Sequence, residues 1–243
     1  MPRPQTDVKV GFAMKRIGIL GGVSAESTVS YYQTITREFI RRHGHAGYPE
    51  ILIYSVSFAE YAELQHAGRW DELAARMVEV FRALAQAGAE IGLIAANTLH
   101  IVFEEVQARS PIPLLSIVDA TAEAVAEAGL TTVGLLGTKF TMEESFFRHG
   151  LARFGIKALV PEPRERDLVH RVIYEELVRG EVKEGSRRRL LDIVAGLARQ
   201  GAQGVVLGCT ELPFLIRPED TGLPLFDTAR IHALAALELA LHA

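Results

Sequence analysis

An internal repeat constrains the fold of this chain more than any other feature of its sequence. Three short apolar segments recur in the same order, and their first residues are Arg16 and Thr132, Gly88 and Gly201, and Ile112 and Leu223. The separations are 116, 113 and 111 residues. Because unrelated apolar strands would not keep this register, the sequence predicts two similar halves.

Each half begins with a strand, a tight turn and a helix. Residues 16–22 read RIGILGG and residues 132–138 read TVGLLGT, and both are followed by Ser-, Thr- and Glu-containing helix starts. Further strands are predicted at 51–56, 91–95 and 111–117, with a helix over residues 70–87. Strands alternating with helices predict a parallel sheet of about four strands in each half, covered by helices.

The predicted fold class is therefore α/β, with two pseudo-symmetric α/β domains and the active site in the cleft between them. The first domain is predicted to contain residues 14–112 and 224–243, the second residues 113–223, and residues 1–13 form an N-terminal extension. Parallel sheets bind ligands beyond the carboxyl ends of their strands. The repeat register then places Ala96 and Cys209 at matching positions on opposite walls of the cleft.

Composition excludes several classes of partner. The chain has 243 residues and a net charge of -4, without a basic stripe, so neither a nucleic acid nor a membrane surface is expected as a partner. No apolar run reaches the roughly 18 residues of a membrane span, and residues 1–13 lack the apolar core of a signal peptide. The single cysteine excludes a disulfide framework and a multi-cysteine zinc site, as expected for a cytoplasmic protein.

That single cysteine, Cys209, ends an apolar strand and is the main catalytic candidate. A thiol is acidified at a helix N-terminus, and the turn from Thr210 to Pro213 predicts amide groups directed at Cys209, hence a lowered thiol pKa. An acid or base on each wall would suit the movement of a proton between the two faces of a carbon. Asn97, Thr98 and Thr210 offer donors of the kind that hold a carboxylate.

The segments ANTLH at 96–100 and GCTE at 208–211, together with GGVS at 21–24, resemble the aspartate/glutamate racemase family. The resemblance extends over nearly the whole chain from Met14 and is closest to the aspartate racemase and broad-specificity amino-acid racemase branch. It implies a cofactor-independent racemase that binds no metal, a small-molecule amino-acid substrate and a possible homodimer. In such enzymes one cysteine removes the α-proton and a second, across the cleft, returns a proton to the other face.

The resemblance also implies roles for individual residues. Cys209 matches the cysteine that faces the L-enantiomer, and Ala96 stands where its partner cysteine is expected. Asn97, Thr98 and Thr210 match positions that bind the substrate α-carboxylate. The remaining candidates for substrate binding are Gly22, Val23, Ser24, Glu211 and, for a side-chain carboxylate, Arg166.

Because alanine cannot give or take a proton, Ala96 leaves three hypotheses open. In the first, Ala96 is a natural variant or an engineered replacement, and the racemase is less active or one-sided. The second keeps the fold but is a single-cysteine decarboxylase of the arylmalonate type, and the third is a non-catalytic protein that binds amino acids or dicarboxylates. Glu211 either assists Cys209 or caps the following turn, and His100 is expected to hold the backbone by hydrogen bonds.

Overall fold

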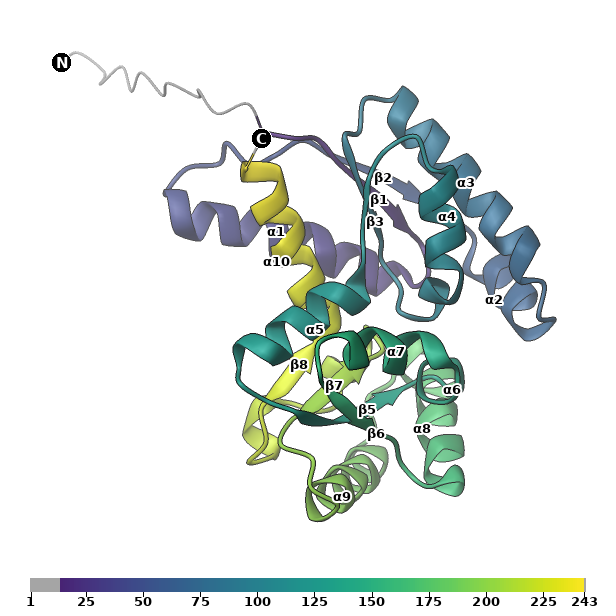
Figure 1. Cartoon of the computed structure of the whole chain (residues 1–243), viewed down its shortest axis with the longest axis vertical. Helices are drawn as coiled ribbons and strands as arrows, with labels where there is room; N and C mark the ends of the chain where they lie inside the picture. Colours follow the sequence, from purple (N-terminus) through teal and green to yellow (C-terminus); the bar gives the residue numbers. More distant parts are fainter. Residues whose placement is uncertain (1–13, 243) are drawn as a thin grey trace.

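The computed structural model describes residues 14–242, which form two α/β domains (Figure 1). The strand order is β2-β1-β3-β4 in the first sheet and β6-β5-β7-β8 in the second, and all pairs are parallel. The predicted fold class is confirmed, and the identical strand order agrees with the internal repeat. The predicted extension at residues 1–13 lies outside the described residues.

The first sheet has its helices on both faces. Its strands are β1 (Ile17–Gly21), β2 (Ile51–Ser55), β3 (Ile91–Ile94) and β4 (Leu114–Leu115). The helices between them are α1 (Ala25–His43), α2 (Phe58–His66), α3 (Trp70–Gln86), the 3-10 helix η1 (Thr98–Val102) and α4 (Phe103–Arg109). Apolar residues recur at helical spacing in α3, and its buried face packs against Leu20 and Ile94 of the sheet.

The second sheet repeats this arrangement. Its strands are β5 (Thr132–Gly137), β6 (Lys157–Leu159), β7 (Val205–Gly208) and β8 (Leu225–Asp227). The remaining helices are α5 (Ile117–Glu127), α6 (Lys139–Glu143), α7 (Ser145–Arg153), α8 (Pro163–Glu175), η2 (Leu177–Arg179), α9 (Glu184–Arg199), η3 (Leu212–Phe214), η4 (Pro218–Asp220) and α10 (Thr228–Leu241). Between residues 14 and 242, no helix is both long and apolar enough to cross a membrane.

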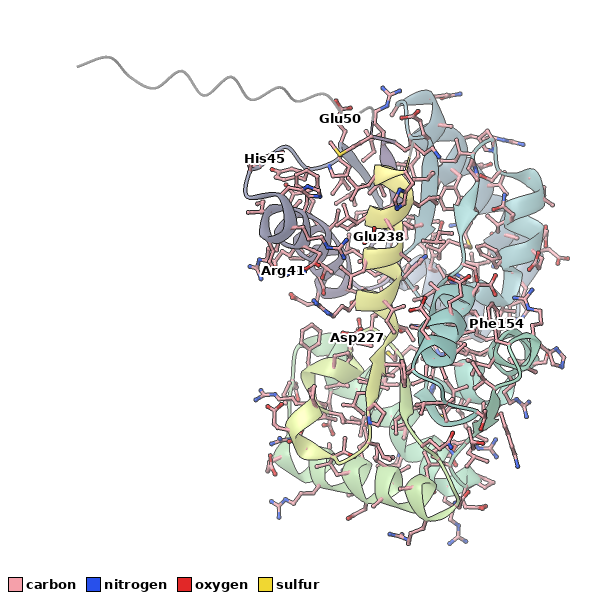
Figure 2. All side chains as sticks on the ribbon, turned by 60° about the vertical axis from the view of Figure 1, so that its left-hand side comes forward. Arg41, His45, Glu50, Phe154, Asp227 and Glu238 are labelled. Carbon is pink, nitrogen blue, oxygen red and sulfur yellow. The ribbon has the colours of Figure 1, made fainter. Side chains whose placement is uncertain are left out.

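Two helices cross from one domain to the other. Helix α5 follows the first sheet but packs on the second, where Val125 shares a core cluster with Leu135 of β5. Helix α10 follows the second sheet but packs on the first, where Leu237 shares a core cluster with Ile19 of β1. Asp227 caps the N-terminus of α10 and lies at the junction of the domains (Figure 2). Each domain therefore completes its core with a helix that the other sheet supplies.

The crossing points differ from the predicted domain boundaries. Leu114 pairs with Gly92, so the first sheet extends beyond residue 112. Leu225 pairs with Val205, so β8 belongs to the second sheet although residues 224–243 were predicted to join the first domain. The outer strands β4 and β8 stay with their own sheets because their backbone groups find hydrogen-bond partners in the neighbouring strands β3 and β7. The chain crosses to the other domain only after these strands.

Candidate active site

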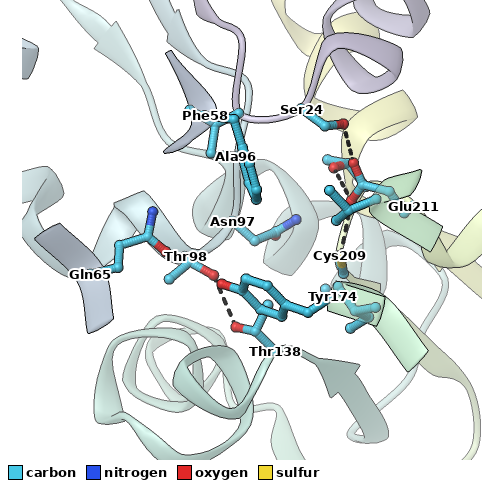
Figure 3. A pocket seen from close by; sticks show the side chains of 15 residues that line it. Ser24, Phe58, Gln65, Ala96, Asn97, Thr98, Thr138, Tyr174, Cys209 and Glu211 are labelled. Carbon is cyan, nitrogen blue, oxygen red and sulfur yellow. Dashed lines mark hydrogen bonds between the residues drawn. The ribbon is translucent and has the colours of Figure 1, made fainter. Parts of the chain in front are cut away.

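A cavity of about 50 Å³ lies between the two domains, beyond the carboxyl ends of both sheets (Figure 3). Its walls are formed by Val23, Ser24, Phe58, Gln65, Ala96, Asn97, Thr98, Thr138, Ile173, Tyr174, Val178, Gly208, Cys209, Thr210 and Glu211. Ligand sites commonly measure roughly 300 Å³ or more. The cavity must therefore widen for an amino acid to bind in it.

Cys209 lies directly after β7 and is part of a buried hydrogen-bond network. Its thiol donates to Oε2 of Glu211 at 3.0 Å, and the Thr210 hydroxyl donates to the same oxygen at 2.9 Å. The hydroxyl of Ser24, in the first domain, donates to Oε1 of Glu211. Glu211 makes no side-chain hydrogen bond that caps η3. The Glu211 side chain therefore contacts Cys209 and does not cap the following turn.

The surroundings of Cys209 determine its protonation state. Burial raises the pKa of its thiol well above the usual value, and the neighbouring Glu211 carboxylate raises it further. The backbone amides of Glu211 and Leu212 lower the thiol pKa, but their effect is smaller. The prediction of a lowered pKa is therefore wrong, because desolvation opposes the thiolate more strongly than two amides stabilise it. Cys209 rests as a neutral thiol.

Ala96 lies on the opposite wall, directly after β3. It is buried and lines the same cavity as Cys209, so the structure brings together the two positions that the repeat register pairs. The Ala96 methyl group offers no proton to a ligand. The two walls thus have matching backbones and different chemistry.

His100 holds the Ala96 loop in place. Its Nδ1 donates to the carbonyl oxygen of Ala96 at 2.9 Å, and its Nε2 accepts from the Ile117 amide at 3.1 Å. Burial lowers the pKa of His100 to about 3, so the ring is neutral and can play both parts. The predicted backbone-holding role of His100 is confirmed.

Asn97 presents an acceptor at the cleft. The Thr228 hydroxyl donates to the Leu207 carbonyl oxygen at 2.9 Å and must therefore accept the hydrogen bond from Nδ2 of Asn97, also at 2.9 Å. This chain of donors fixes the orientation of the amide. Oδ1 of Asn97 is buried and has no hydrogen-bond partner within residues 14–242. It is an unpartnered acceptor on a residue that lines the cavity.

Two hydrogen bonds cross the cleft at related positions. Ser24 donates to Glu211, and the hydroxyls of Thr98 and Thr138 are 2.9 Å apart (Figure 3). The repeat register pairs Thr98 with Glu211, while Ser24 and Thr138 are the N-caps of α1 and α6. The cleft is thus closed by two pseudo-symmetric contacts, which we call the cross-cleft hydrogen bonds.

Aromatic side chains of both domains pack beside the cavity. His66 and Trp70 belong to the first domain, and Phe140, His170 and Tyr174 belong to the second. The ring centroids of Trp70 and Phe140 are 5.5 Å apart, and those of His66 and Tyr174 are 5.4 Å apart. Because Tyr174 also lines the cavity, this packing adds to the closure of the cleft.

Of the three predicted substrate-binding residues in the first glycine turn, two line the cavity and one does not. Val23 and Ser24 line the cavity, whereas Gly22 is not among the lining residues. The Gly22 amide donates to the Thr28 hydroxyl at 2.8 Å, and the backbone has φ +92°, a conformation that favours glycine. Gly22 therefore shapes the turn that places Ser24.

Arg166 also lies outside the cavity lining, in contrast to its predicted place beside a substrate carboxylate. It is on α8, and its Nε lies 3.6 Å from Oε1 of Glu143. The same helix presents Ile173 and Tyr174 to the cavity, about two turns later along the axis. About two turns of α8 thus separate Arg166 from the residues of this helix that line the cavity.

Seven lining residues were not among the predicted site residues. Two of them, Thr138 and Gly208, lie in the repeated segments themselves, and the other five are Phe58, Gln65, Ile173, Tyr174 and Val178. These five follow the second strand of each sheet, directly in α2 and through α8 and η2. The rule that ligands bind beyond strand ends applies to these strands too. The strand predicted at 51–56 could have indicated that the segment after it lines the cleft, and the internal repeat could have extended this expectation to the second half. Within residues 14–242 no three His, Cys, Asp or Glu side chains are grouped to hold a metal ion.

Comparison with known proteins gives consistent matches. The model of the Asp/Glu/Hydantoin racemase family matches residues 20–236. The broad specificity amino-acid racemase of Bacillus subtilis (strain 168) is 22% identical over 225 residues, which are 88% of this chain and 92% of that protein.

Solved structures extend the similarity. A Yersinia pestis protein is 40% identical with a TM-score of 0.87, and the match covers 94% of this chain and 100% of that one. An aspartate racemase homologue from Pyrococcus horikoshii OT3 is 38% identical with a TM-score of 0.81, with 93% and 99% covered. The residue range matched by the family model, 20–236, contains every residue that lines the cavity.

Proposed function

The chain belongs to the Asp/Glu/hydantoin racemase family, and on that premise we propose that it is a cofactor-independent amino-acid isomerase in which Cys209 exchanges the α-proton of L-amino acids. One observation carries the proposal. A buried thiol donates to a carboxylate inside a two-walled cleft, and the matching position on the other wall is alanine. This arrangement supports proton transfer at one face of a substrate.

The charges around the cavity favour an amino acid over a malonate. Glu211 is the only Asp, Glu, Lys, Arg or His among the lining residues, and Oδ1 of Asn97 is an unpartnered acceptor. Both groups attract the ammonium of an amino acid. An arylmalonate would instead add two carboxylates to a cavity that has one already, so the decarboxylase is the weaker hypothesis.

Proton transfer follows the hydrogen bond between the Cys209 thiol and Glu211. Glu211 takes the thiol proton, and the positive substrate ammonium stabilises the thiolate. The thiolate then removes the α-proton, so the C–H bond breaks, an S–H bond forms, and the electron pair remains on the substrate as a carbanion delocalised into its carboxylate. Return of a proton from the same thiol restores the L-enantiomer. Inversion requires a donor on the opposite wall, where Ala96 has none.

Incubation in D2O tests this function. L- and D-aspartate, L- and D-glutamate and a panel of neutral amino acids are followed by mass spectrometry for α-deuterium and by chiral chromatography for inversion. We expect deuterium in L-amino acids with at least tenfold less inversion than exchange, and loss of exchange in Cys209→Ala. Ala96→Cys, which restores a thiol on the other wall, is expected to raise inversion at least tenfold.

The other hypotheses predict different results. Binding of amino acids without exchange would identify a binding protein, and release of carbon dioxide from an arylmalonate would identify a decarboxylase. If Ala96→Cys left inversion unchanged for every substrate that exchanges, Ala96 would not mark the place of a partner base.

A further inference from the structure

We propose that the cleft selects amino acids with an uncharged side chain and discriminates against aspartate and glutamate. This inference rests on the proposed function, since it concerns the substrate of the same site. No Lys, Arg or His is among the fifteen residues that line the cavity, and Glu211 contributes a negative charge. A substrate with a second carboxylate therefore finds no cation in the cleft.

The two carboxylates of an acidic amino acid are not equivalent in this setting. The α-carboxylate enters beside the substrate's own ammonium, which offsets its charge. A side-chain carboxylate has no such partner and is repelled by Glu211, which already accepts hydrogen bonds from Ser24, Thr210 and Cys209. Repulsion between like charges a few ångströms apart weakens binding in a partly buried site.

Two basic residues near the lining segments have acidic partners outside the lining. Lys139 pairs with Asp167, whose carboxylate raises the pKa of Lys139 through a hydrogen bond. Arg166 pairs with Glu143 at 3.6 Å. Neither Lys139 nor Arg166 lines the cavity. Nε of Arg166 is buried without a hydrogen-bond partner among the described residues, so Arg166 is the cation to test for recruitment by an acidic substrate.

The walls offer apolar surface where a substrate side chain can lie. Val23 and Phe58 come from the first domain, and Ile173 and Val178 come from the second. Apolar area removed from water favours binding in proportion to its size. A charged side chain would lose its hydration on entering the cavity, and these apolar walls offer no polar contacts in exchange. The lining therefore favours an uncharged side chain through both attraction and exclusion.

The experiment is a competition in D2O. The intact protein is given an equimolar mixture of L-alanine, L-leucine, L-methionine, L-phenylalanine, L-aspartate and L-glutamate, and α-deuterium is measured for each. We expect at least one neutral amino acid to exceed both acidic ones at least tenfold in kcat/KM, and Arg166→Gln to leave that ratio within twofold. Aspartate or glutamate exchanging as fast as the neutral substrates would overturn the inference, and loss of that exchange in Arg166→Gln would identify the cation responsible.

A second variant tests the cause of the selectivity. Val178→Lys adds a cation to the lining and is expected to shift the acidic-to-neutral ratio at least tenfold towards the acidic substrates. Val178→Met, which is long but uncharged, is the matched control and should not shift the ratio towards the acidic substrates. An equal shift in both variants would mean that shape rather than charge selects the substrate.

Failure of the proposed function can be distinguished from failure of this inference. If no amino acid exchanges a proton, the proposed function is wrong, and calorimetric titration with L-leucine and L-aspartate then decides the inference. Tighter binding of leucine supports selection of uncharged side chains, whereas equal or tighter binding of aspartate overturns it.

Discussion

At the scale of single residues, the proposed mechanism requires Glu211 to enable the neutral thiol of Cys209 to act as a base. Burial and the Glu211 charge keep the proton on Cys209, yet the same carboxylate is the acceptor of that proton. In the proposed mechanism this proton is transferred only after the ammonium group of a substrate enters. A thiol in an electropositive site would instead be ionised before the substrate arrives.

Glu211→Gln separates these effects. Removing the carboxylate charge is expected to lower the pKa of Cys209, because Glu211 raises it, so the pH midpoint for alkylation by iodoacetamide should move down. Exchange of α-protons should nevertheless fall at least a hundredfold, since an amide cannot accept the thiol proton. Ser24→Ala is the control that keeps the carboxylate and removes one of its donors. Unchanged exchange in Glu211→Gln would show that another group takes the proton.

The sequence predicted which residues meet at the site but not the charge state of the thiol. Cys209 and Ala96 could be paired because the repeat register is a property of the chain itself. The pKa of Cys209 depends on burial and on Glu211, whose side chain turns back towards the thiol only in the folded protein. Arg166 was misplaced because the length of α8, not its composition, separates it from the cleft.

At the scale of elements, two buried histidines fasten the crossing helices. His100 accepts from the Ile117 amide at the start of α5. His232 of α10 contacts the Leu115 carbonyl oxygen through Nε2 at 3.0 Å and the Tyr31 hydroxyl through Nδ1 at 2.9 Å. Burial lowers the pKa of His100 to about 3 and that of His232 to about 4.

Acid should therefore destabilise the fold. Well above pH ~6.5 both histidines are neutral in the folded and unfolded chains, so neither lowers the free energy of unfolding there. As the pH falls towards 4, the unfolded chain binds protons that the folded one cannot, which removes up to about 1.4 kcal/mol of unfolding free energy per pH unit for each histidine. Urea unfolding between pH 8 and 5 measures this slope. His100→Gln should reduce it, and the exposed His149→Gln should not; equal slopes in wild type and His100→Gln would contradict the assignment.

Element types followed from local patterns, but element partners did not. The alanines at 229, 233, 236 and 240 mark one apolar face of α10 at helical spacing, and that face is buried. The pattern contains no information on which sheet the face covers, because both sheets are apolar. For the same reason the predicted boundaries assigned β4 to the second domain and β8 to the first, whereas β4 pairs in the first sheet and β8 in the second.

At the scale of the whole molecule, the exchanged helices couple the two domains. Leu151 of α7 is fully buried in the cluster that holds α5, and α5 is covalently continuous with the first sheet. Destabilisation of the second domain therefore releases a helix that the chain of the first domain supplies. The domains are expected to unfold together.

Leu151→Ala tests this coupling, since such core truncations cost about 2–5 kcal/mol. Hydrogen exchange followed by mass spectrometry should show the slowest amides of β1 and β3 accelerating by the same factor as those of β5 and β7. Arg188→Ala, on the exposed face of α9, is the control and should change neither sheet. Acceleration confined to the second sheet would mean that each domain unfolds independently.

The exchange of α5 and α10 also has a consequence for how the two halves of the chain could have arisen. One half of the chain, on its own, could complete its core only by trading its last helix with a second copy, as in a domain-swapped homodimer. Twofold symmetry would oblige such a dimer to carry the same residue on both walls of its cleft. Joining the copies in one polypeptide removes that obligation. Cys209 and Ala96, at matching positions on the two walls, are a difference that only the fused chain can encode.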